Sequence, residues 1–220
     1  MKIIHINPLT PDNLAESNNE DYFKSDEIYG GWATPLIRNI IGKGSNFEFE
    51  HWKMYDSDLL GDKGIIIKEK YGIVFRFFPS RKYYRFASLG FMSKDLIASI
   101  RNVQIDEKRL LIHIQSQPHT LFTLLIALQC KNIPLIGYQG GPRGPAWFRF
   151  KFSKNPYFLF LHILDSIACK YCYDLIIAGS SWEYNFIRKF YGNEKSIIAR
   201  RRGFNFDLVK NLDKQALRKE

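Results

Sequence analysis

Short apolar runs alternate with longer amphipathic segments over most of this chain. The short runs are rich in isoleucine, and several end in polar or glycine-rich residues, which is typical of buried strands in a parallel sheet. The pattern predicts strands at residues 2–6, 47–53, 65–67, 73–78, 110–113, 134–138, 174–178 and 196–199.

The longer segments between these runs have the length and spacing of helices. They predict helices at residues 32–41, 84–101 and 121–130, in a segment that ends near residue 171, and from Ser181 onward. Residues 7–29 are polar and acidic and predict a loop, whereas the strands on either side of residues 68–72 predict a hairpin. Because strands and helices alternate, the sequence predicts an α/β fold with a Rossmann-like, doubly wound, mostly parallel sheet and helices on both faces.

Residues 110–144 predict one complete strand–helix–strand unit with polar residues after each strand. Ligands bind at the carboxyl ends of strands in open α/β sheets. We therefore expect His113, His119 and Gln139 at one edge of the sheet, although a lone strand histidine is also commonly structural. The loop after the second strand offers backbone N–H groups and a guanidinium to phosphates or sugar hydroxyls; it contains Gly140, Gly141 and Arg143.

Gly30 and Gly31 precede the helix that is predicted to begin at Trp32. Glycine permits close approach of the backbone, and a helix N-terminus attracts anions, so the pair is a candidate phosphate site. A plain turn before a helix explains the same residues.

The chain has 220 residues, is 45% hydrophobic and carries a net charge of +10, which suits one globular domain or two small ones. Residues 1–60 contain 10 acidic and 5 basic residues, so 27 bases face 12 acids in the remainder. A basic surface favours an anionic partner.

Residues 147–154 mix aromatic and basic side chains, which suits an anionic membrane surface, stacked nucleic-acid bases or a buried approach to a helix. We favour the membrane over nucleic acid because no nucleic-acid-binding motif accompanies this stretch.

The three cysteines, Cys130, Cys169 and Cys172, do not form a disulfide framework. Cys169 and Cys172 form a single CxxC in a predicted helix, for which a packing role is favoured over redox chemistry or metal binding.

The N-terminus lacks the features of a signal peptide, and no apolar run reaches the roughly 20 residues that span a bilayer. The expected compartment is the cytoplasm.

The order of these motifs resembles the N-terminal, acceptor-side domain of GT-B glycosyltransferases, especially the retaining family 4 group. The resemblance rests on KIIHI, the GG before the first helix, LLIHIQ, IPLIGYQGG, DLIIAGSSWE and IIARRRGFNFDLV. It implies transfer of a sugar from a UDP- or GDP-linked donor to a glycan or lipid-linked acceptor, without a cofactor and without a metal in this domain. Asp56 and Asp58 form a DxD, which holds a metal-bound sugar nucleotide in another glycosyltransferase fold, but a solvated turn is the favoured interpretation.

The resemblance also implies a division of the site. Residues 1–206 correspond to the Rossmann-like domain and 207–220 to the start of a linker, while the donor-binding second domain is not in this chain. Many relatives have a histidine where this chain has Gln139, and asparagine is usual where it has Arg202. The implied catalytic residues are His113 and Gln139, and the implied substrate-binding residues are Gly30, Gly31, Trp32, His119, Gly140, Gly141, Arg143, Ser180 and Glu183.

Three functions remain open at this stage. The first is an acceptor-binding half of a glycosyltransferase, inactive without a C-terminal domain that is supplied as a separate chain or lies in a longer protein. The second is a non-catalytic binding module or partner subunit that tethers an anionic ligand or a membrane. The third is a different Rossmann-like nucleotide-binding protein.

Overall fold

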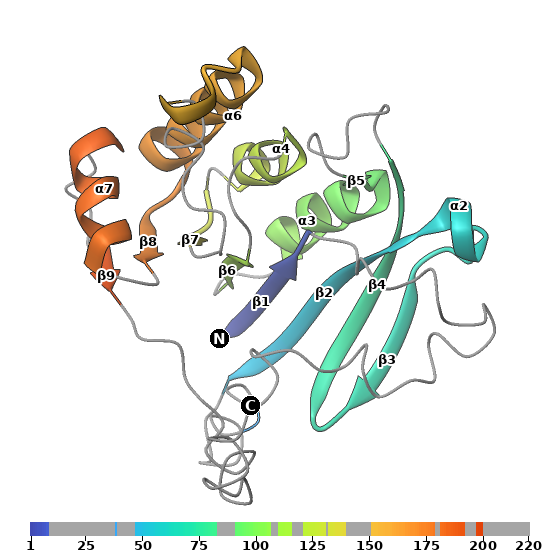
Figure 1. Ribbon diagram of the computed structural model, residues 1–220. Helices are drawn as coiled ribbons and strands as arrows, with labels where there is room; N and C mark the ends of the chain where they lie inside the picture. The colour runs from blue at the N-terminus through green and yellow to red at the C-terminus, as the bar shows by residue number, and fades with distance from the viewer. Residues whose placement is uncertain are drawn as a thin grey trace, which may run out of the picture.

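The computed structural model describes residues 1–8, 38, 47–82, 91–106, 110–115, 121–130, 132–139, 151–178, 181–191 and 197–199. These residues form a twisted sheet in the order β3-β4-β2-β1-β6-β7-β8-β9, with β5 pairing on β4 (Figure 1). The strands are β1 (Lys2–Asn7), β2 (Glu48–Asp56), β3 (Ile66–Lys70), β4 (Ile73–Lys82), β5 (Phe91–Met92), β6 (Leu110–Gln115), β7 (Leu135–Gln139), β8 (Leu175–Ala178) and β9 (Ile197–Ala199). The helices are α2 (Ser57–Leu60), α3 (Lys94–Asp106), α4 (Leu121–Gln129), α6 (Pro156–Ile167), the π-helical turn η5 (Ala168–Cys172) and α7 (Ser181–Tyr191).

The predicted α/β class and the mostly parallel sheet are confirmed. β4, β2, β1, β6, β7, β8 and β9 run parallel, whereas β3 and β5 pair antiparallel to β4. Parallel strands need crossover connections, so the helices between them are a consequence of this pairing. Every strand predicted from the sequence is present, and most of their ends shift by one to four residues.

The hairpin is tighter than predicted. Residues 68–70 continue β3, and only Tyr71 and Gly72 form the turn. Their φ angles are 59° and 71°, which is the left-handed pair required by a two-residue type I′ turn. Gly72 accepts this conformation without strain, whereas Tyr71 is held there by the pairing of β3 with β4.

The predicted helix at residues 84–101 is wrong at its start. Phe91 and Met92 form β5, and α3 begins only after Ser93. The Ser93 hydroxyl accepts a hydrogen bond from the Leu96 amide at 3.2 Å, as a helix N-cap does. Residues 83–90 lie outside the described part of the chain.

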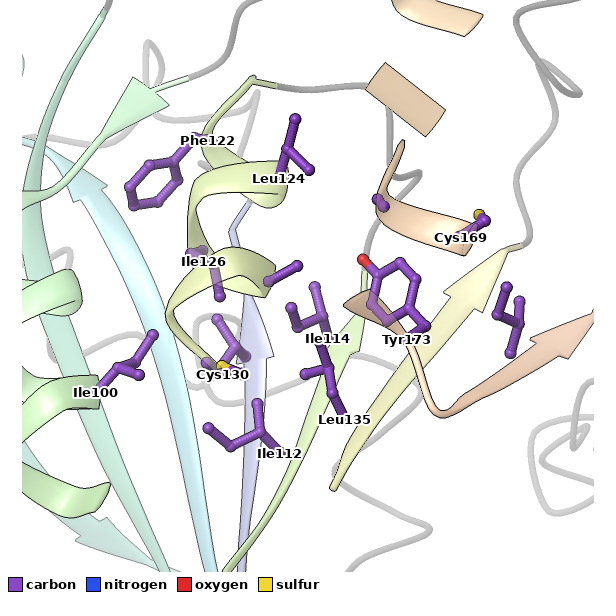
Figure 2. Packing of buried hydrophobic residues seen from close by; sticks show 14 of the residues in the cluster. Ile100, Ile112, Ile114, Phe122, Leu124, Ile126, Cys130, Leu135, Cys169 and Tyr173 are labelled. Atoms are coloured by element: carbon purple, nitrogen blue, oxygen red, sulfur yellow. The ribbon is translucent and has the colours of Figure 1, made fainter. Parts of the chain in front are cut away.

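The main hydrophobic core lies between one face of the sheet and the helices α3, α4, α6 and α7. Figure 2 shows α4 above β6 and β7, with Ile126, Ile114 and Leu135 packed together. Gly137 is required in β7 because a Cβ at this position would lie 2.9 Å from the ring of Tyr173. Cys169 of the CxxC is buried in this core and Cys172 packs against it, which supports the packing role favoured for the pair.

The opposite face of the sheet is also buried in its centre, although its apolar residues do not belong to that core cluster. Phe75 and Phe77 of β4 are fully buried there. The helix predicted at residues 32–41 lies outside the described residues except Arg38, whose guanidinium lies 4.3 Å from the centre of the Tyr71 ring. The described helices of the core therefore cover one face, and the predicted covering of both faces is not tested. The predicted boundary between residues 206 and 207 also lies outside the described part.

Candidate functional site

The order of strands reverses between β1 and β6. The chain moves from β1 to β2 on one side of β1, and from β6 to β7 in the other direction. In open α/β sheets this reversal opens a crevice at the carboxyl ends of the two strands, where ligands bind. The strands end here at Asn7 and Gln115.

Three histidines from three neighbouring strands lie side by side, and two of them are two residues from the carboxyl ends of β1 and β6. His5 in β1 is paired in register with His51 in β2 and with His113 in β6. The Nδ1 atoms of His5 and His113 are 2.8 Å apart, which is a hydrogen bond. The ring centres of His5 and His51 are 4.7 Å apart in an edge-to-face arrangement. We call these three residues the histidine row.

Burial keeps the outer members of the histidine row neutral. It lowers the pKa of His113 to about 3, with a further contribution from the neighbouring His5. It also lowers the pKa of His51 well below the ordinary value, together with repulsion from His5, Lys53 and His113. Both ring nitrogens of His51 and the Nε2 of His113 are buried without a hydrogen-bond partner in the described structure. Because their pKa values are lowered so far, His51 and His113 are weak bases, so this row is suited to hydrogen bonding and orientation rather than to proton abstraction at neutral pH.

Lys53 lies two residues further along β2, next to Asn7 at the crevice. Burial lowers its pKa to about 8, and its ammonium lies 5.9 Å from the centre of the Phe75 ring. Perturbed groups concentrate at functional sites, and a cationic side chain at this edge suits an anionic ligand. Lys53, His5 and His51 were not identified from the sequence. Their alternate spacing within two apolar strands was the available signal, but only the strand pairing brings them together.

The structure describes three of the predicted site residues. His113 is the fourth residue of β6, so this strand continues two residues beyond the predicted end. Gln139 is the last residue of β7, three residues beyond Ile136, which is paired with His113. Glu183 lies in the first turn of α7 and is buried. The remaining candidates lie outside the described residues: Gly30, Gly31, Trp32, His119, Gly140, Gly141, Arg143 and Ser180.

The DxD forms a turn, as favoured from the sequence, and this turn also caps α2. Asp56 is the N-cap of α2, and its Oδ1 accepts a hydrogen bond from the Asp58 amide at 2.9 Å. The Asp58 carboxylate is exposed and lies 3.8 Å from the Arg81 guanidinium. Within the described ranges, no group of three or more histidine, cysteine or acidic side chains could hold a metal ion.

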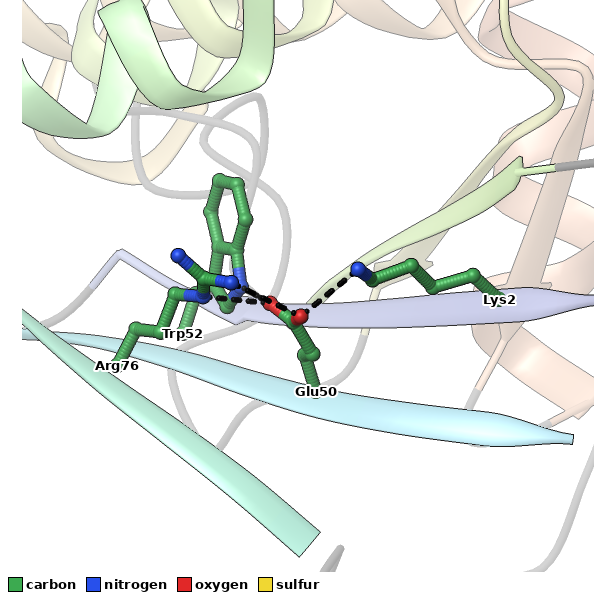
Figure 3. Close-up of polar contacts among 4 residues, drawn as sticks. All are labelled: Lys2, Glu50, Trp52 and Arg76. Carbon is green, nitrogen blue, oxygen red and sulfur yellow. Dashed lines mark hydrogen bonds and ion pairs between the residues drawn. The ribbon is translucent and has the colours of Figure 1, made fainter. Parts of the chain in front are cut away.

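A second polar cluster lies on the other face of the sheet from the histidine row, at the same level of β2 (Figure 3). The Arg76 guanidinium donates to both carboxylate oxygens of Glu50, at 2.7 and 3.1 Å. The Trp52 indole donates to Oε2 at 2.6 Å, and the Lys2 ammonium lies 2.9 Å from Oε1. We call these four residues the Glu50 cluster. Its bonds connect β1, β2 and β4, so we assign it to the stability of the sheet.

Glu50 remains ionised despite its burial. Burial acts to raise the pKa of this carboxyl group, but hydrogen bonds from Arg76, Lys2 and Trp52 and the charge of Arg76 lower it, and the net pKa falls below the ordinary value. A carboxylate with this many donors is fully satisfied.

Comparison with known proteins identifies the fold. No protein-family model matches the chain, and no curated protein sequence is significantly similar to it. The structure is similar to HepE from Anabaena, with a TM-score of 0.50 and 14% identity to its complex with UDP and glucose. The complex of HepE with UDP-glucose gives a TM-score of 0.50 at 16% identity. An α,α-trehalose-phosphate synthase (UDP-forming) from Burkholderia vietnamiensis gives a TM-score of only 0.39, which is too low to support an argument.

The likeness to HepE covers 100% of this chain and 49% of HepE, so the chain spans about half the length of the structure that it matches. Its α/β fold matches one half of a GT-B glycosyltransferase. An assignment to family 4 remains a hypothesis. No described helix is long and apolar enough to cross a membrane.

Proposed function

We propose that this chain is the acceptor-binding half of a glycosyltransferase. The observation that carries the proposal is the reversal of strand order between β1 and β6, in a fold that matches half of a GT-B enzyme, with the buried histidine row two residues from the ends of both strands. In the proposed reaction, an acceptor hydroxyl attacks the anomeric carbon of a nucleotide sugar, the bond from this carbon to the diphosphate breaks, and the nucleoside diphosphate leaves and takes up the hydroxyl proton. The UDP and glucose bound to HepE support a UDP-linked donor, and a GDP-linked donor is the alternative.

The proposed roles follow from position. Gln139, at the carboxyl end of β7, hydrogen-bonds the acceptor hydroxyl through its amide and does not take its proton, since an amide is not a base. His113 is neutral, so we assign it to orientation of polar groups at the floor of the crevice. Lys53 supplies positive charge beside Asn7. The phosphate-binding roles of Gly30, Gly31 and Arg143 and the contacts of Trp32, His119, Gly140, Gly141, Ser180 and Glu183 are part of the same proposal.

The donor site is proposed to come mainly from a second domain, in the same longer protein or in a partner chain. The chain aligns with only 49% of HepE, which supports a division of the site between two halves. The acceptor is proposed to be a glycan or a lipid-linked saccharide, in the cytoplasm or at the inner face of the membrane. A surface polysaccharide or another envelope glycan would be the product.

Reconstitution tests this proposal. The isolated 220-residue chain is incubated with UDP- and GDP-sugars and a panel of lipid-linked and free saccharides, alone and with a separately produced donor-binding domain. We expect no transfer by the chain alone and transfer after the second domain is added. Turnover by the chain alone would refute the division of the site. Absence of turnover with every second domain, combined with saturable binding of an anionic ligand, would instead identify a non-catalytic binding module.

Gln139→Ala tests the assignment of the acceptor contact in the reconstituted enzyme. We expect kcat/KM to fall about tenfold, because one hydrogen bond to the acceptor is lost. Asn102→Ala removes an exposed amide from α3 and is the matched control, with no expected effect. Unchanged turnover of Gln139→Ala would remove Gln139 from the site.

A further inference from the structure

Helix α6 has an apolar face that remains in solvent. Leu161 and Leu164 pack into the core and are 4% and 5% exposed. Leu159, Phe160 and Ile163 are 36%, 42% and 48% exposed. At 3.6 residues per turn, positions 159, 160 and 163 form one stripe along the helix, beside the stripe that faces the core. In Figure 1, α6 lies at the outer end of the helical layer, beyond α4.

Aromatic and basic side chains flank both ends of this stripe. Phe152 before α6 is 83% exposed, and Tyr171 after it is 77% exposed. Lys151 and Lys154 lie on the first side and Lys170 on the second, and all three are exposed. We call the stripe with these flanking residues the α6 surface. Large exposed apolar patches of this kind mark interaction sites.

The charge of this segment selects the partner. Residues 143–171 contain five basic residues and one acidic residue. An apolar stripe between lysines and aromatic rings matches an anionic bilayer, whose acyl region takes the apolar side chains while its phosphates take the lysines. A second copy of the chain would bring the same lysines against one another, which is unfavourable.

The geometry points to peripheral docking of the α6 surface on a bilayer that contains anionic lipids, and we propose this as a further function of the domain. The choice of a lipid surface rests on the proposed function, because a lipid-linked acceptor is presented there. Asn155 caps α6, with the Tyr157 amide donating to its Oδ1 at 3.0 Å. Tyr173 and Asp174 alone connect the end of η5 to the amino end of β8, so α6 begins towards the carboxyl ends of the strands, where Gln139 lies. Docking would therefore place the acceptor crevice near the membrane.

Vesicle sedimentation with the full 220-residue chain tests the proposal. We expect binding to phosphatidylcholine vesicles that contain phosphatidylglycerol, weak binding to pure phosphatidylcholine, and a decrease with added salt. Phe160→Ser with Ile163→Ser should weaken binding at least tenfold, because two apolar side chains no longer enter the bilayer. Lys151→Gln and Lys154→Gln should each weaken it about fivefold.

Strand β3 provides the matched control. Ile67 is 56% exposed and Lys68 is exposed, but both lie at the opposite side of the sheet. Ile67→Ser with Lys68→Gln should leave binding unchanged, and circular dichroism confirms that each variant is folded. An equal loss in the β3 variant would refute the α6 surface, as would equal binding of the wild type to neutral and anionic vesicles.

Sedimentation velocity separates docking from self-association. A wild-type dimer that Phe160→Ser with Ile163→Ser dissociates, together with no vesicle binding, would overturn the proposal in favour of a second copy. The vesicle assay contains no nucleotide sugar and no second domain. A chain that binds vesicles but supports no transfer would therefore contradict the proposed function and leave the docking surface standing. A chain that supports transfer but does not bind vesicles would contradict the docking surface and leave the proposed function standing.

Discussion

Glu50 and His51 are neighbours in β2, and they belong to two buried polar clusters of opposite character. The Glu50 cluster on one face of the sheet has donors for each carboxylate oxygen, which come from Arg76, Trp52 and Lys2. The histidine row on the other face leaves both nitrogens of His51 without a hydrogen-bond partner in the described structure. Unsatisfied buried polar groups are uncommon in stable cores, so they need a reason.

The two clusters lie at the same level of β2, because His51 stands between Glu50 and Trp52, but they occupy opposite faces of the sheet. The Glu50 cluster connects three strands through paired charges and hydrogen bonds, which is a structural task. The histidine row lies beneath the carboxyl ends of β1 and β6, where ligands bind in this class of fold. Functional sites are where natural sequences retain polar groups at a cost to stability. The comparison therefore supports the histidine row as part of the site.

Lowering the pH should produce the largest difference between the two clusters in their contribution to the free energy of unfolding. Histidines start from an ordinary pKa of 6.5 when unfolded, whereas Glu50 starts from 4.5. Because the folded pKa values of His51 and His113 are lowered, the unfolded state binds more protons below pH 6.5. Stability should thus fall from pH 6.5 downward, by about 1.4 kcal/mol per pH unit or about 3 kcal/mol by pH 4.5 for His113, and His51 should add a loss in the same direction. Urea unfolding at several pH values measures this slope.

Glu50 contributes to folding stability over a different range of pH. Its pKa is lowered, so its stabilisation is complete above pH 4.5 and is lost only below that value. His51→Leu with His113→Leu should flatten the slope between pH 6.5 and 4.5. A slope in that range that survives this double substitution would assign the acid sensitivity elsewhere.

Removal of the Glu50 carboxylate should have the next largest effect. Glu50→Ala leaves the charges of Arg76 and Lys2 without their partner, and we expect a loss of about 3 kcal/mol in the free energy of unfolding. This value is at the low end for buried pairs because the Arg76 and Lys2 side chains are 28% and 14% exposed. Glu48→Ala on the same strand removes an exposed carboxylate and should change little.

A triple substitution sharpens that result. Lys2→Met, Glu50→Met and Arg76→Met together remove all the charges and fill similar volumes, so most of the lost stability should return. A triple variant as unstable as Glu50→Ala would show that packing around Trp52, rather than an uncompensated charge, is responsible.

His51→Leu should have the smallest effect on the free energy of unfolding, and it should increase this free energy rather than lower it. Leucine removes two unsatisfied nitrogens and keeps a buried apolar side chain, so stability at pH 7 should rise by about 1 kcal/mol. The measurement is urea unfolding at pH 7. A loss of stability comparable with that of Glu50→Ala would show that the nitrogens of His51 are bonded in solution, and the contrast between the two clusters would then fail.

The sequence predicted the strands well because each carries its own signal. KIIHI, LLIHI and DLIIA are short apolar runs that end in polar residues, and all three are parallel strands of the sheet. Local sequence signals failed to predict elements whose formation depends on pairing with a distant strand. β5 at Phe91–Met92 has too few residues to show a period, and it exists because it pairs with Arg81 and Lys82 of β4.

The site was harder to predict for the same reason. His113 was identified from its own strand, but His5 is 108 residues away in the sequence, and nothing in KIIHI indicates that their rings meet. His51 and Lys53 appeared only as members of an alternating strand. Their burial, and therefore their lowered pKa values, depends on the neighbouring strands.

The sequence alone thus determined which segments form strands, that most strands run parallel, and that polar residues gather at their carboxyl ends. These properties depend on side-chain periodicity and on connection lengths, which are local. Only the tertiary structure decided that Glu50 and His51 meet opposite environments, that three histidines form a row beneath the reversal of strand order, and that one apolar stripe of α6 stays in solvent. Those facts depend on strand order and helix placement, because desolvation and hydrogen-bond pairing are set by neighbours that are distant in the sequence.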